Sequence, residues 1–185
     1  MSKQIVIISG SPNAASRLNG MIDWVRQALE SKGYSTATIT VVTLPADDLI
    51  QSRFASPAII EANKLVEDAS AVIIASPVYK ASFTGVLKTY IDLLPQKGLE
   101  GKLVLPLFIG GTLAHLLSIE YALKPVLATM GARHFIRGVY ATDDLINRIQ
   151  DGSNDTTFEL NEELQGRLHD SVEELITEFQ LRNRA

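Results

Sequence analysis

The fold is decided by the stretch Gln4-Ile-Val-Ile-Ile-Ser-Gly-Ser-Pro-Asn-Ala-Ala-Ser-Arg17, which leads into a segment of helical periodicity at Leu18. Its first part is an unbroken apolar run, as expected for a strand of a parallel sheet that helices cover on both faces. The run ends in glycine, serine and proline, which favour turns. The stretch therefore predicts a buried strand, a loop and a helix, which together open a βαβ unit.

The same alternation of short apolar runs and longer amphipathic segments continues along the chain. The expected strands cover residues 3–9, 38–43, 71–76, 103–109 and 134–141. The expected helices cover residues 18–31, 57–68, 82–94, 112–130 and 159–180, with Ser56 capping the second of them. This alternation predicts a single α/β domain over residues 1–185, with a doubly wound, five-stranded parallel sheet in a three-layer α/β/α sandwich. The polar segment 143–157 is expected to be a mobile surface connector, with a lid or a subunit contact as the alternative.

Composition narrows the possible functions. The chain has 185 residues, 46% of them hydrophobic and 21% charged, which is ordinary for a globular protein. A formal net charge of −4 gives no basic footprint for nucleic acid or for an anionic membrane. The absence of cysteine excludes disulfides, thiolate metal sites and a cysteine nucleophile, and we expect no metal site. No apolar run is long enough for a signal peptide or a membrane span, so we expect a cytoplasmic protein.

The loop after the first strand has the composition of a phosphate site. A helix that starts near Leu18 offers backbone N–H groups and a favourable dipole to an anion. The serines of this stretch add hydroxyl groups, and an arginine adds a charge-assisted contact; they are Ser9, Ser11, Ser16 and Arg17. The glycine pattern of a dinucleotide-binding loop and the lysine of a Walker loop are both missing, so a terminal monoester phosphate fits best. The alternative is an ordinary strand-to-helix turn with a capping serine.

Two further loops follow the third and fourth expected strands, at the same edge of the sheet. The first reads Ser76-Pro77-Val78-Tyr79-Lys80, which puts a rigid turn and an aromatic ring at a strand end. The second reads Phe108-Ile109-Gly110-Gly111-Thr112, where paired glycines let the backbone approach a ligand. Together the loops predict a surface that lines a flat heterocycle. The alternatives are a packing role for Tyr79, a plain Gly-Gly turn, and solvated lysines at 80 and 88, with Lys88 paired to Asp92 on a helix.

At these loops the chain resembles a known family. The motifs Gly-Ser-Pro at 10–12, Ser-Pro-Val-Tyr-Lys at 76–80 and Gly-Gly-Thr-Leu-Ala-His at 110–115 are similar to those of NADPH-dependent FMN reductases. Among these, the resemblance is closest to the reductase component of two-component alkanesulfonate monooxygenase systems. It is densest over residues 71–127, and the stretch 76–89 is its most specific part.

The resemblance implies a flavodoxin-like fold and hydride transfer from the nicotinamide C4 of NADPH to the flavin N5 of FMN. It also implies that reduced FMN passes to a flavin-dependent monooxygenase that desulfonates organosulfonates. Binding and orientation are then the protein's contribution, so we name no general acid or base. The residues expected at FMN are Ser9, Ser11, Ser16, Arg17, Pro77, Val78, Tyr79, Gly110, Gly111, Thr112 and His115. Many relatives carry arginine at the position of Asn13, so Arg17 is the expected compensation.

The expected helix 112–130 contains a proline that disturbs it. Pro125 cannot donate to the carbonyl of Tyr121, and its ring clashes there, so a bulge or kink is predicted around Tyr121. In the resembling reductases a tyrosine inserted here creates a π-helix at a tetramer interface, and that π-helix is associated with flavin release. The resemblance therefore implies a homo-tetramer or dimer. The alternative is a kinked helix with Tyr121 packed on a neighbouring element.

Two other functions remain open on the same fold. One is a flavin-retaining reductase of quinones, azo compounds or metal ions. The other is a flavodoxin-type electron carrier without nicotinamide activity, which the modest charge of −4 disfavours. No residue distinguishes NADPH from NADH, and His134 and His169 belong to no catalytic pattern.

Overall fold

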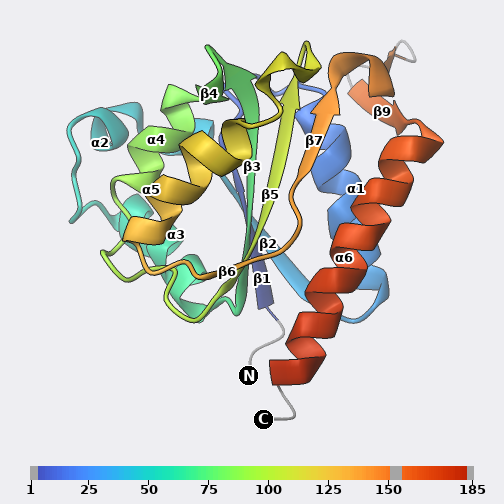
Figure 1. Cartoon of the computed structure of the whole chain (residues 1–185). Helices are drawn as coiled ribbons and strands as arrows, with labels where there is room; N and C mark the ends of the chain where they lie inside the picture. Colours follow the sequence, from blue (N-terminus) through green and yellow to red (C-terminus); the bar gives the residue numbers. More distant parts are fainter. Residues whose placement is uncertain (1–3, 151–155, 183–185) are drawn as a thin grey trace.

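A central sheet with helices on both faces forms the molecule, and the computed structural model describes residues 4–150 and 156–182 (Figure 1). Its main strand order is β2-β1-β3-β5-β6, and these neighbours are parallel. This is the 2-1-3-4-5 order of flavodoxin-like folds. The strands are β1 (Gln4–Ser9), β2 (Ser35–Thr40), β3 (Ala71–Tyr79), β4 (Ser82–Phe83), β5 (Leu103–Gly110), β6 (His134–Phe135) and β7 (Val139–Thr142).

The expected α/β architecture is confirmed, but the sheet has seven strands instead of five. The strand expected at 134–141 is split into β6 and β7, both of which pair with β5. The break lies opposite Pro106 of β5, which has no N–H to give to the ladder. Gly138 lies against the Pro106 ring and carbonyl at the same point. The seventh strand is β4, which forms an antiparallel hairpin with the end of β3.

The two helical layers bury alternate residues of the central strands β1, β3 and β5. Ile5 and Ile7 of β1 pack with α1 (Leu18–Ser31) and α6 (Glu162–Arg182). Val6 and Ile8 pack with the opposite layer. That layer contains α3 (Pro57–Asp68), α4 (Gly85–Ile91) and α5 (Lys124–Thr129). Because the strands carry apolar residues on both sides, they read as continuous apolar runs in the sequence.

Several expected boundaries are wrong for local reasons. The second strand starts at Ser35, and residues 41–43 form a 3₁₀ turn, η1 (Val41–Thr43), before the short helix α2 (Ala46–Ile50). The helix expected at 82–94 begins only at Gly85, because Ser82 and Phe83 form β4, and it ends at Ile91. Ser56 precedes α3, but its hydroxyl donates to Asp48 (2.5 Å) and caps no helical N–H. The last helix starts at Glu162, not at 159, because strand β9 occupies the preceding residues.

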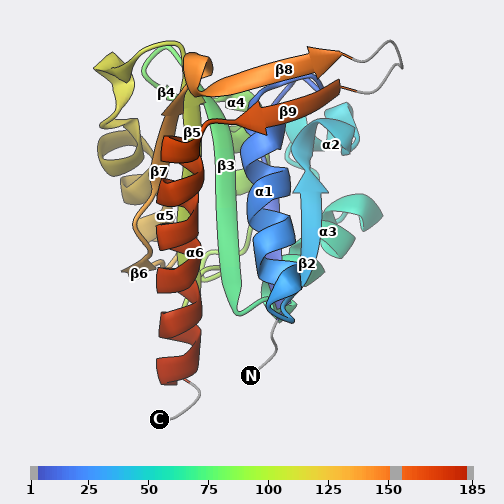
Figure 2. The same ribbon diagram turned by 90° about the vertical axis from the view of Figure 1, so that its right-hand side faces the viewer.

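The segment expected to be a surface connector is ordered where it is described. It contains a 3₁₀ turn, η4 (Asp143–Leu145), and a hairpin of β8 (Ile146–Gln150) and β9 (Thr156–Leu160). Residues 151–155 lie outside the described part of the chain. Figure 2 shows the hairpin crossing over the end of α1 that carries the expected phosphate loop. The expectation of an irregular loop was therefore wrong for 143–150 and 156–157.

The helix expected at 112–130 is interrupted, as its proline predicted. A 3₁₀ turn, η2 (Leu113–His115), comes first, and a π-helix, η3 (Ile119–Leu123), then leads into α5. Pro125 lies in the first turn of α5, where a missing N–H does no harm. The bulge predicted around Tyr121 is thus confirmed as a π-helix. Tyr121 is 78% exposed, so the alternative of a packed Tyr121 is wrong for this chain alone.

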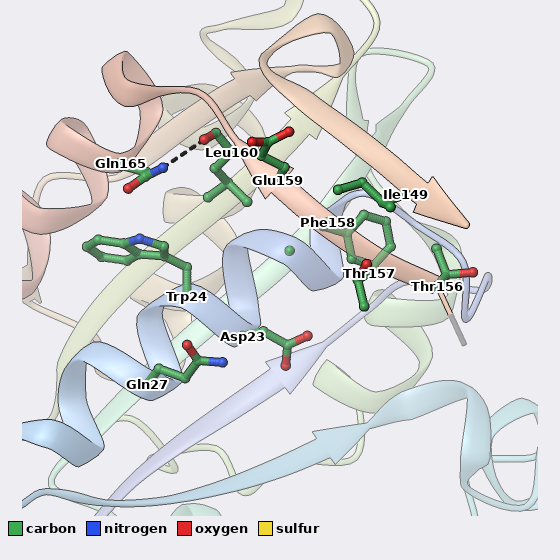
Figure 3. Close-up of a pocket in the computed structure, with 11 residues that line it drawn as sticks. Asp23, Trp24, Gln27, Ile149, Thr156, Thr157, Phe158, Glu159, Leu160 and Gln165 are labelled. Atoms are coloured by element: carbon green, nitrogen blue, oxygen red, sulfur yellow. Dashed lines mark hydrogen bonds between the residues drawn. The ribbon is translucent and has the colours of Figure 1, made fainter. Parts of the chain in front are cut away.

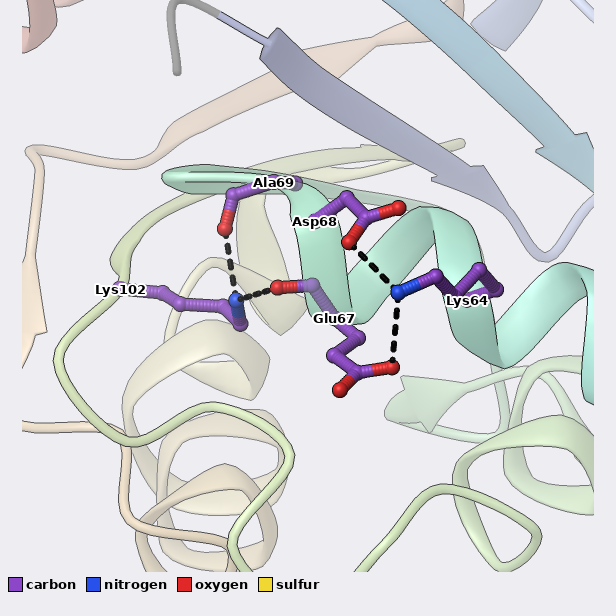
Figure 4. A network of polar contacts seen from close by, with 5 residues as sticks. All are labelled: Lys64, Glu67, Asp68, Ala69 and Lys102. Atoms are coloured by element: carbon purple, nitrogen blue, oxygen red, sulfur yellow. Dashed lines mark hydrogen bonds and ion pairs between the residues drawn. The ribbon is translucent and has the colours of Figure 1, made fainter. Parts of the chain in front are cut away.

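At the other end of the strands, away from the expected site, a lysine joins the start of β5 to the end of α3 (Figure 4). Lys102, just before β5, donates to the carbonyls of Glu67 (2.9 Å) and Ala69 (2.6 Å) at the end of α3. A cation at a helix C-terminus satisfies carbonyls that have no helical partner. Burial lowers the pKa of Lys102, and Asp68 and Glu67 act against that shift. In the described residues no helix is both long enough and apolar enough to cross a membrane.

Candidate functional site

A pocket of about 240 Å³ opens at the carboxyl ends of β1, β3 and β5. The sheet order reverses between β1 and β3, which is where ligands of such folds bind. Seven of the residues expected at FMN line this pocket: Ser16, Arg17, Pro77, Val78, Tyr79, Gly110 and Gly111. The structure thus brings the three expected loops together, and the role of their residues in binding stays a prediction.

The loop between β1 and α1 is shaped by its own side chains. Asn13 Oδ1 accepts from the Ala15 amide (2.8 Å), and Ser16 Oγ accepts from the Leu18 amide (3.3 Å). Ser11 is buried, and its hydroxyl donates to the Asn13 carbonyl (3.0 Å). Within the described residues, the amides of Ser11, Ala14 and Arg17 donate to no partner. Unpaired N–H groups at the start of a helix are the donors that a phosphate requires.

Ser9 and Ser11 do not line the pocket. Both are buried, with exposed fractions of 3% and 4%, and Ser11 serves the loop from within. Their expected direct contact with a phosphate therefore has no support in the pocket geometry, while a role in shaping the loop does.

Two arginines join the loop to the β8–β9 hairpin. Arg17 Nε donates to the Ile146 carbonyl at the start of β8 (2.8 Å). In return, Arg148 Nη2 from β8 donates to the Ala15 carbonyl in the loop (2.5 Å). Both arginines line the pocket, and Asp143 is its carboxylate. The expected cation Arg17 is thus partly engaged with the hairpin, and a second cation comes from a segment expected to be a connector.

The Gly-Gly loop packs against a buried tyrosine. Tyr140 of β7 is 2% exposed, and its hydroxyl donates to the Thr112 carbonyl (2.7 Å). Burial, and secondarily the Asp143 carboxylate, raise the pKa of Tyr140, so its hydroxyl stays a neutral donor. A Cβ at Gly110 would lie 2.4 Å from the Tyr140 hydroxyl, whereas one at Gly111 would have no atom nearer than Asp143 Oδ2 at 3.8 Å. Close packing against Tyr140 therefore requires glycine at position 110, whereas the space beside the Gly111 backbone is open.

A buried threonine connects the loops. Thr84 Oγ1 donates to the Gly10 carbonyl (2.6 Å) and accepts from the Leu87 amide (3.0 Å). The Thr84 amide donates to Ser76 Oγ (3.0 Å), just before Pro77. Thr84 is 1% exposed, so water cannot replace these bonds. It fixes the loop after β1, the loop that begins at Ser76 and helix α4 relative to one another.

Tyr79 is presented by a strained turn. It is 53% exposed at the end of β3, and it pairs with Ser82 across a two-residue hairpin. The two turn residues, Lys80 and Ala81, both have positive φ values, 51° and 63°. This is the backbone of a type I′ turn, which normally takes asparagine or glycine. The strain holds an exposed aromatic ring at the pocket.

Ala81→Gly is therefore expected to raise the free energy of unfolding by about 0.5–1 kcal/mol, because relief of the left-handed strain exceeds the added chain entropy. Urea unfolding measures the change. Ala128→Gly, inside α5, should shift stability the other way by about 1 kcal/mol. A loss of stability in Ala81→Gly would show that the turn is not strained.

The other expected residues lie beside the pocket. Thr112 is exposed, and its hydroxyl accepts from the Ala114 amide (3.2 Å) at the start of η2. His115 is half-buried in η2 and is not among the residues that line the pocket. Lys88 and Asp92 form the expected ion pair along α4 (2.6 Å). Lys80 lies in the turn, on no helix.

A larger cavity of about 460 Å³ lies between α1 and the β8–β9 hairpin (Figure 3). Trp24 of α1 and Phe158 of β9 are drawn at its two sides, with Asp23 and Gln27 along the helix. None of the residues expected at FMN lines it. We assign the site to the smaller pocket, because that pocket lies at the strand ends and is lined by the two arginines and by residues of the loop that carries the unpaired amides.

The donors at this pocket fit FMN. Amides at the start of α1 and two guanidinium groups suit a phosphate, and the backbone at Gly111 is open to a flat ring at the end of β5. Tyr79 and Val78 offer an aromatic and an aliphatic surface beside it.

Sequence reasoning missed several residues of the site. Asp143 follows β7, so the rule that ligands bind at strand ends could have found it. Thr84 carried the signal of a helix cap, hidden by the expectation of an earlier helix start. Arg148 and Tyr140 carried no local signal, because only the tertiary fold brings them to the loops.

Known proteins place the chain in a family. Residues 4–144 match the NADPH-dependent FMN reductase family. The chain is 41% identical over 169 residues to the FMN reductase (NADPH) of Pseudomonas putida, which covers 91% of this chain and 84% of that protein. It is 39% identical over 143 residues to the FMN reductase (NADPH) of Escherichia coli, covering 77% and 75%.

A solved structure supports the same assignment. The apo form of an NADH:FMN oxidoreductase superposes with a TM-score of 0.80 at 31% identity, covering 93% of this chain and 87% of that one. Fold and sequence identity agree. The chain belongs to the NADPH-dependent FMN reductase family, whose members are enzymes that use FMN and NADPH.

Proposed function

We propose that this reductase uses FMN as a visiting substrate and supplies free reduced FMN to a flavin-dependent monooxygenase in organosulfonate sulfur acquisition. The observation that carries the exchange of flavin is the size of the pocket in a single copy of the chain. At about 240 Å³ it is smaller than the range of about 300–1,000 Å³ that ligand pockets typically span. In one copy of the chain, a pocket of this size leaves part of the flavin in solvent, which favours exchange over retention. We place the reaction in the cytoplasm, where metabolism regenerates NADPH.

The residues of the pocket have separate tasks in this proposal. Arg17 and the unpaired amides of the first loop hold the phosphate, and Ser16 borders it. Pro77, Val78 and Tyr79 support one side of the ring, while Gly110 and Gly111 let backbone approach its edge. FMN supplies a ring that accepts a hydride from the nicotinamide. Proton transfer by a side chain is not required, so orientation is the protein's contribution.

The test is steady-state NADPH oxidation with FMN titrated, together with the absorbance spectrum of the purified protein. We expect a largely colourless protein whose turnover requires added FMN and saturates with it. A yellow protein that turns over quinones or azo compounds without added FMN would show a flavin-retaining reductase. A protein that binds FMN but leaves NADPH unoxidised would show an electron carrier. The same assay with NADH determines the nucleotide preference.

We also propose that the π-helix region forms a contact in a homo-tetramer or dimer. Tyr121, Leu113, Leu116 and Leu117 are between 50% and 78% exposed. They occupy the segment that directly follows the Gly110–Thr112 loop, so a second copy on this surface would lie beside the pocket. Large exposed apolar side chains gathered in one short segment indicate an interaction surface.

Deletion of Tyr121 is expected to convert the π-helix to an α-helix, because it removes the extra residue of the bulge. We expect a smaller oligomer, flavin that copurifies and slower transfer of reduced FMN. Light scattering and the flavin absorbance of the purified protein measure these changes. Phe54→Ala removes an aromatic residue that is 61% exposed elsewhere and is the matched control. An unchanged oligomer and a colourless deletion variant would contradict the proposal.

A further inference from the structure

The β8–β9 hairpin lies at the edge of the family match. That match ends at residue 144, just before β8 begins at Ile146. The hairpin is nevertheless firmly seated, since Ile146 and Leu160 are 1% and 6% exposed and pack with α1, α6 and the sheet. Figure 2 shows it lying over the end of α1. A seated element that reaches the site from outside the region of the family match is a candidate for a further contribution to binding.

Helix α1 is shaped to receive the hairpin. Gly20 lies inside α1, where glycine lowers helix stability. A Cβ at this position would lie 2.7 Å from Phe158 Cβ and 3.1 Å from Leu160 Cδ1, both on β9. Figure 3 shows Phe158 and Leu160 on the strand that crosses above the helix. Gly20 therefore allows the hairpin to pack close to the start of α1.

Close packing brings Arg148 to the phosphate loop. Arg148 pairs with Phe158 across the hairpin, so the two side chains share the face of the hairpin that meets α1. Its Nη2 bonds to the Ala15 carbonyl, and the residue lines the pocket together with Asn13, Ser16 and Arg17. In the described residues, the rest of its guanidinium group has no partner. Arg148 can therefore give further N–H groups to an anion in the pocket.

We propose that Arg148 is a specificity-determining residue that recognises the monoester phosphate of the flavin, delivered to the loop by the β8–β9 hairpin. Asn13 is uncharged, and the Nε of Arg17 is already bonded to the Ile146 carbonyl of the hairpin. With Asp143 as the pocket's carboxylate, Arg17 alone leaves no net positive charge, and Arg148 makes the balance positive. The second cation thus determines the attraction of the pocket for a phosphate.

Two monoester phosphates of the reaction share this chemistry, the 5′-phosphate of FMN and the 2′-phosphate of NADPH. The structure favours FMN, because Arg148 bonds to the same loop whose amides open the N-terminus of α1 at the sheet's switch point. The inference rests on the proposed function for its substrate. Flavin binding tests the role of Arg148, and NADPH oxidation tests the proposed function. Either can therefore fail without the other.

The experiment compares FMN with riboflavin, which lacks the phosphate. Dissociation constants come from quenching of flavin fluorescence, and KM values for NADPH and NADH come from turnover. We expect Arg148→Met to weaken FMN binding about tenfold, the loss of one charge-assisted contact, and to leave riboflavin binding unchanged. Arg148→Lys should retain part of the preference. Lys97→Met removes the same charge from an exposed side chain on another loop and should change neither flavin.

A second variant tests the hairpin without removing a charge. Gly20→Ala should displace Phe158 and reduce the preference for FMN over riboflavin in the same direction. Equal losses for FMN and riboflavin in Arg148→Met would overturn the inference, since they would mean a structural role. An unchanged flavin preference with a raised KM for NADPH but not for NADH would assign Arg148 to the nucleotide instead. Wild-type protein that binds both flavins but oxidises no NADPH would contradict the proposed function alone.

Discussion

Replacement of Gly110 by alanine is expected to weaken FMN binding about tenfold and to lower the free energy of unfolding by about 1–3 kcal/mol. The added Cβ would lie 2.4 Å from the Tyr140 hydroxyl and 3.5 Å from Val78 Cβ. The Tyr140 side chain has no room to move away from the new Cβ, because it is 2% exposed and packed in the core. The strain must therefore move the Gly110 backbone, and with it the Thr112 carbonyl to which Tyr140 donates.

The double variant Gly110→Ala/Tyr140→Phe separates this clash from other causes. Removal of the hydroxyl leaves the new Cβ 3.3 Å from Tyr140 Cζ, a contact that small shifts can relieve. We expect it to recover most of the lost FMN affinity, so that the double variant loses less binding free energy than the two single variants added together. Gly85→Ala is the control, since a Cβ there meets no atom within 4 Å. Flavin fluorescence titration and urea unfolding measure both quantities, and a Gly110→Ala variant with wild-type affinity would refute the packing argument.

The part of the fold that the sequence predicts well is the part whose signals are local. The run Ile5–Ile8 is apolar on both sides, so it identifies a central strand and both helical layers at once. The bulge around Tyr121 was predictable for the same reason, because the effect of Pro125 reaches only four residues back along the chain, whereas its form as a π-helix was implied by the family resemblance. The three strand-end loops met because the carboxyl ends of parallel strands share one edge of the sheet.

What the sequence could not predict depends on partners distant in the chain. The split between β6 and β7 is caused by Pro106, which lies on the neighbouring strand. The β8–β9 hairpin is held by Phe158 on Gly20 and by Arg148 on Ala15, contacts that span more than a hundred residues. Strand β8 lacks the alternation that marks a half-buried strand, and the alternation of β9 covers only five residues, so the sequence predicts a connector here.

The side chain of Thr84 is the connection on which the site's geometry most depends, and Thr84→Val is expected to cost about 2–4 kcal/mol of unfolding free energy. Valine has nearly the shape of threonine but provides no hydroxyl. The Gly10 carbonyl loses a donor at 2.6 Å, and the Leu87 amide loses an acceptor at 3.0 Å. Thr84 is 1% exposed, so each group would remain buried and unpaired.

The loss of these bonds should also weaken FMN binding, because Thr84 joins the loop at Gly10 to the strand end at Ser76. We expect the KM for FMN to rise at temperatures where Thr84→Val is still fully folded, with urea unfolding as the check on stability. Thr84→Ser retains the hydroxyl and should lose only about 1 kcal/mol, from its missing methyl group. Thr129→Val alters an exposed threonine that bonds within its own helix and should stay within about 0.5 kcal/mol of the wild type. If Thr84→Val were as stable as Thr129→Val, the loops at Gly10 and Ser76 would have to be positioned by strand pairing alone, and the buried hydroxyl would have no part in shaping the flavin pocket.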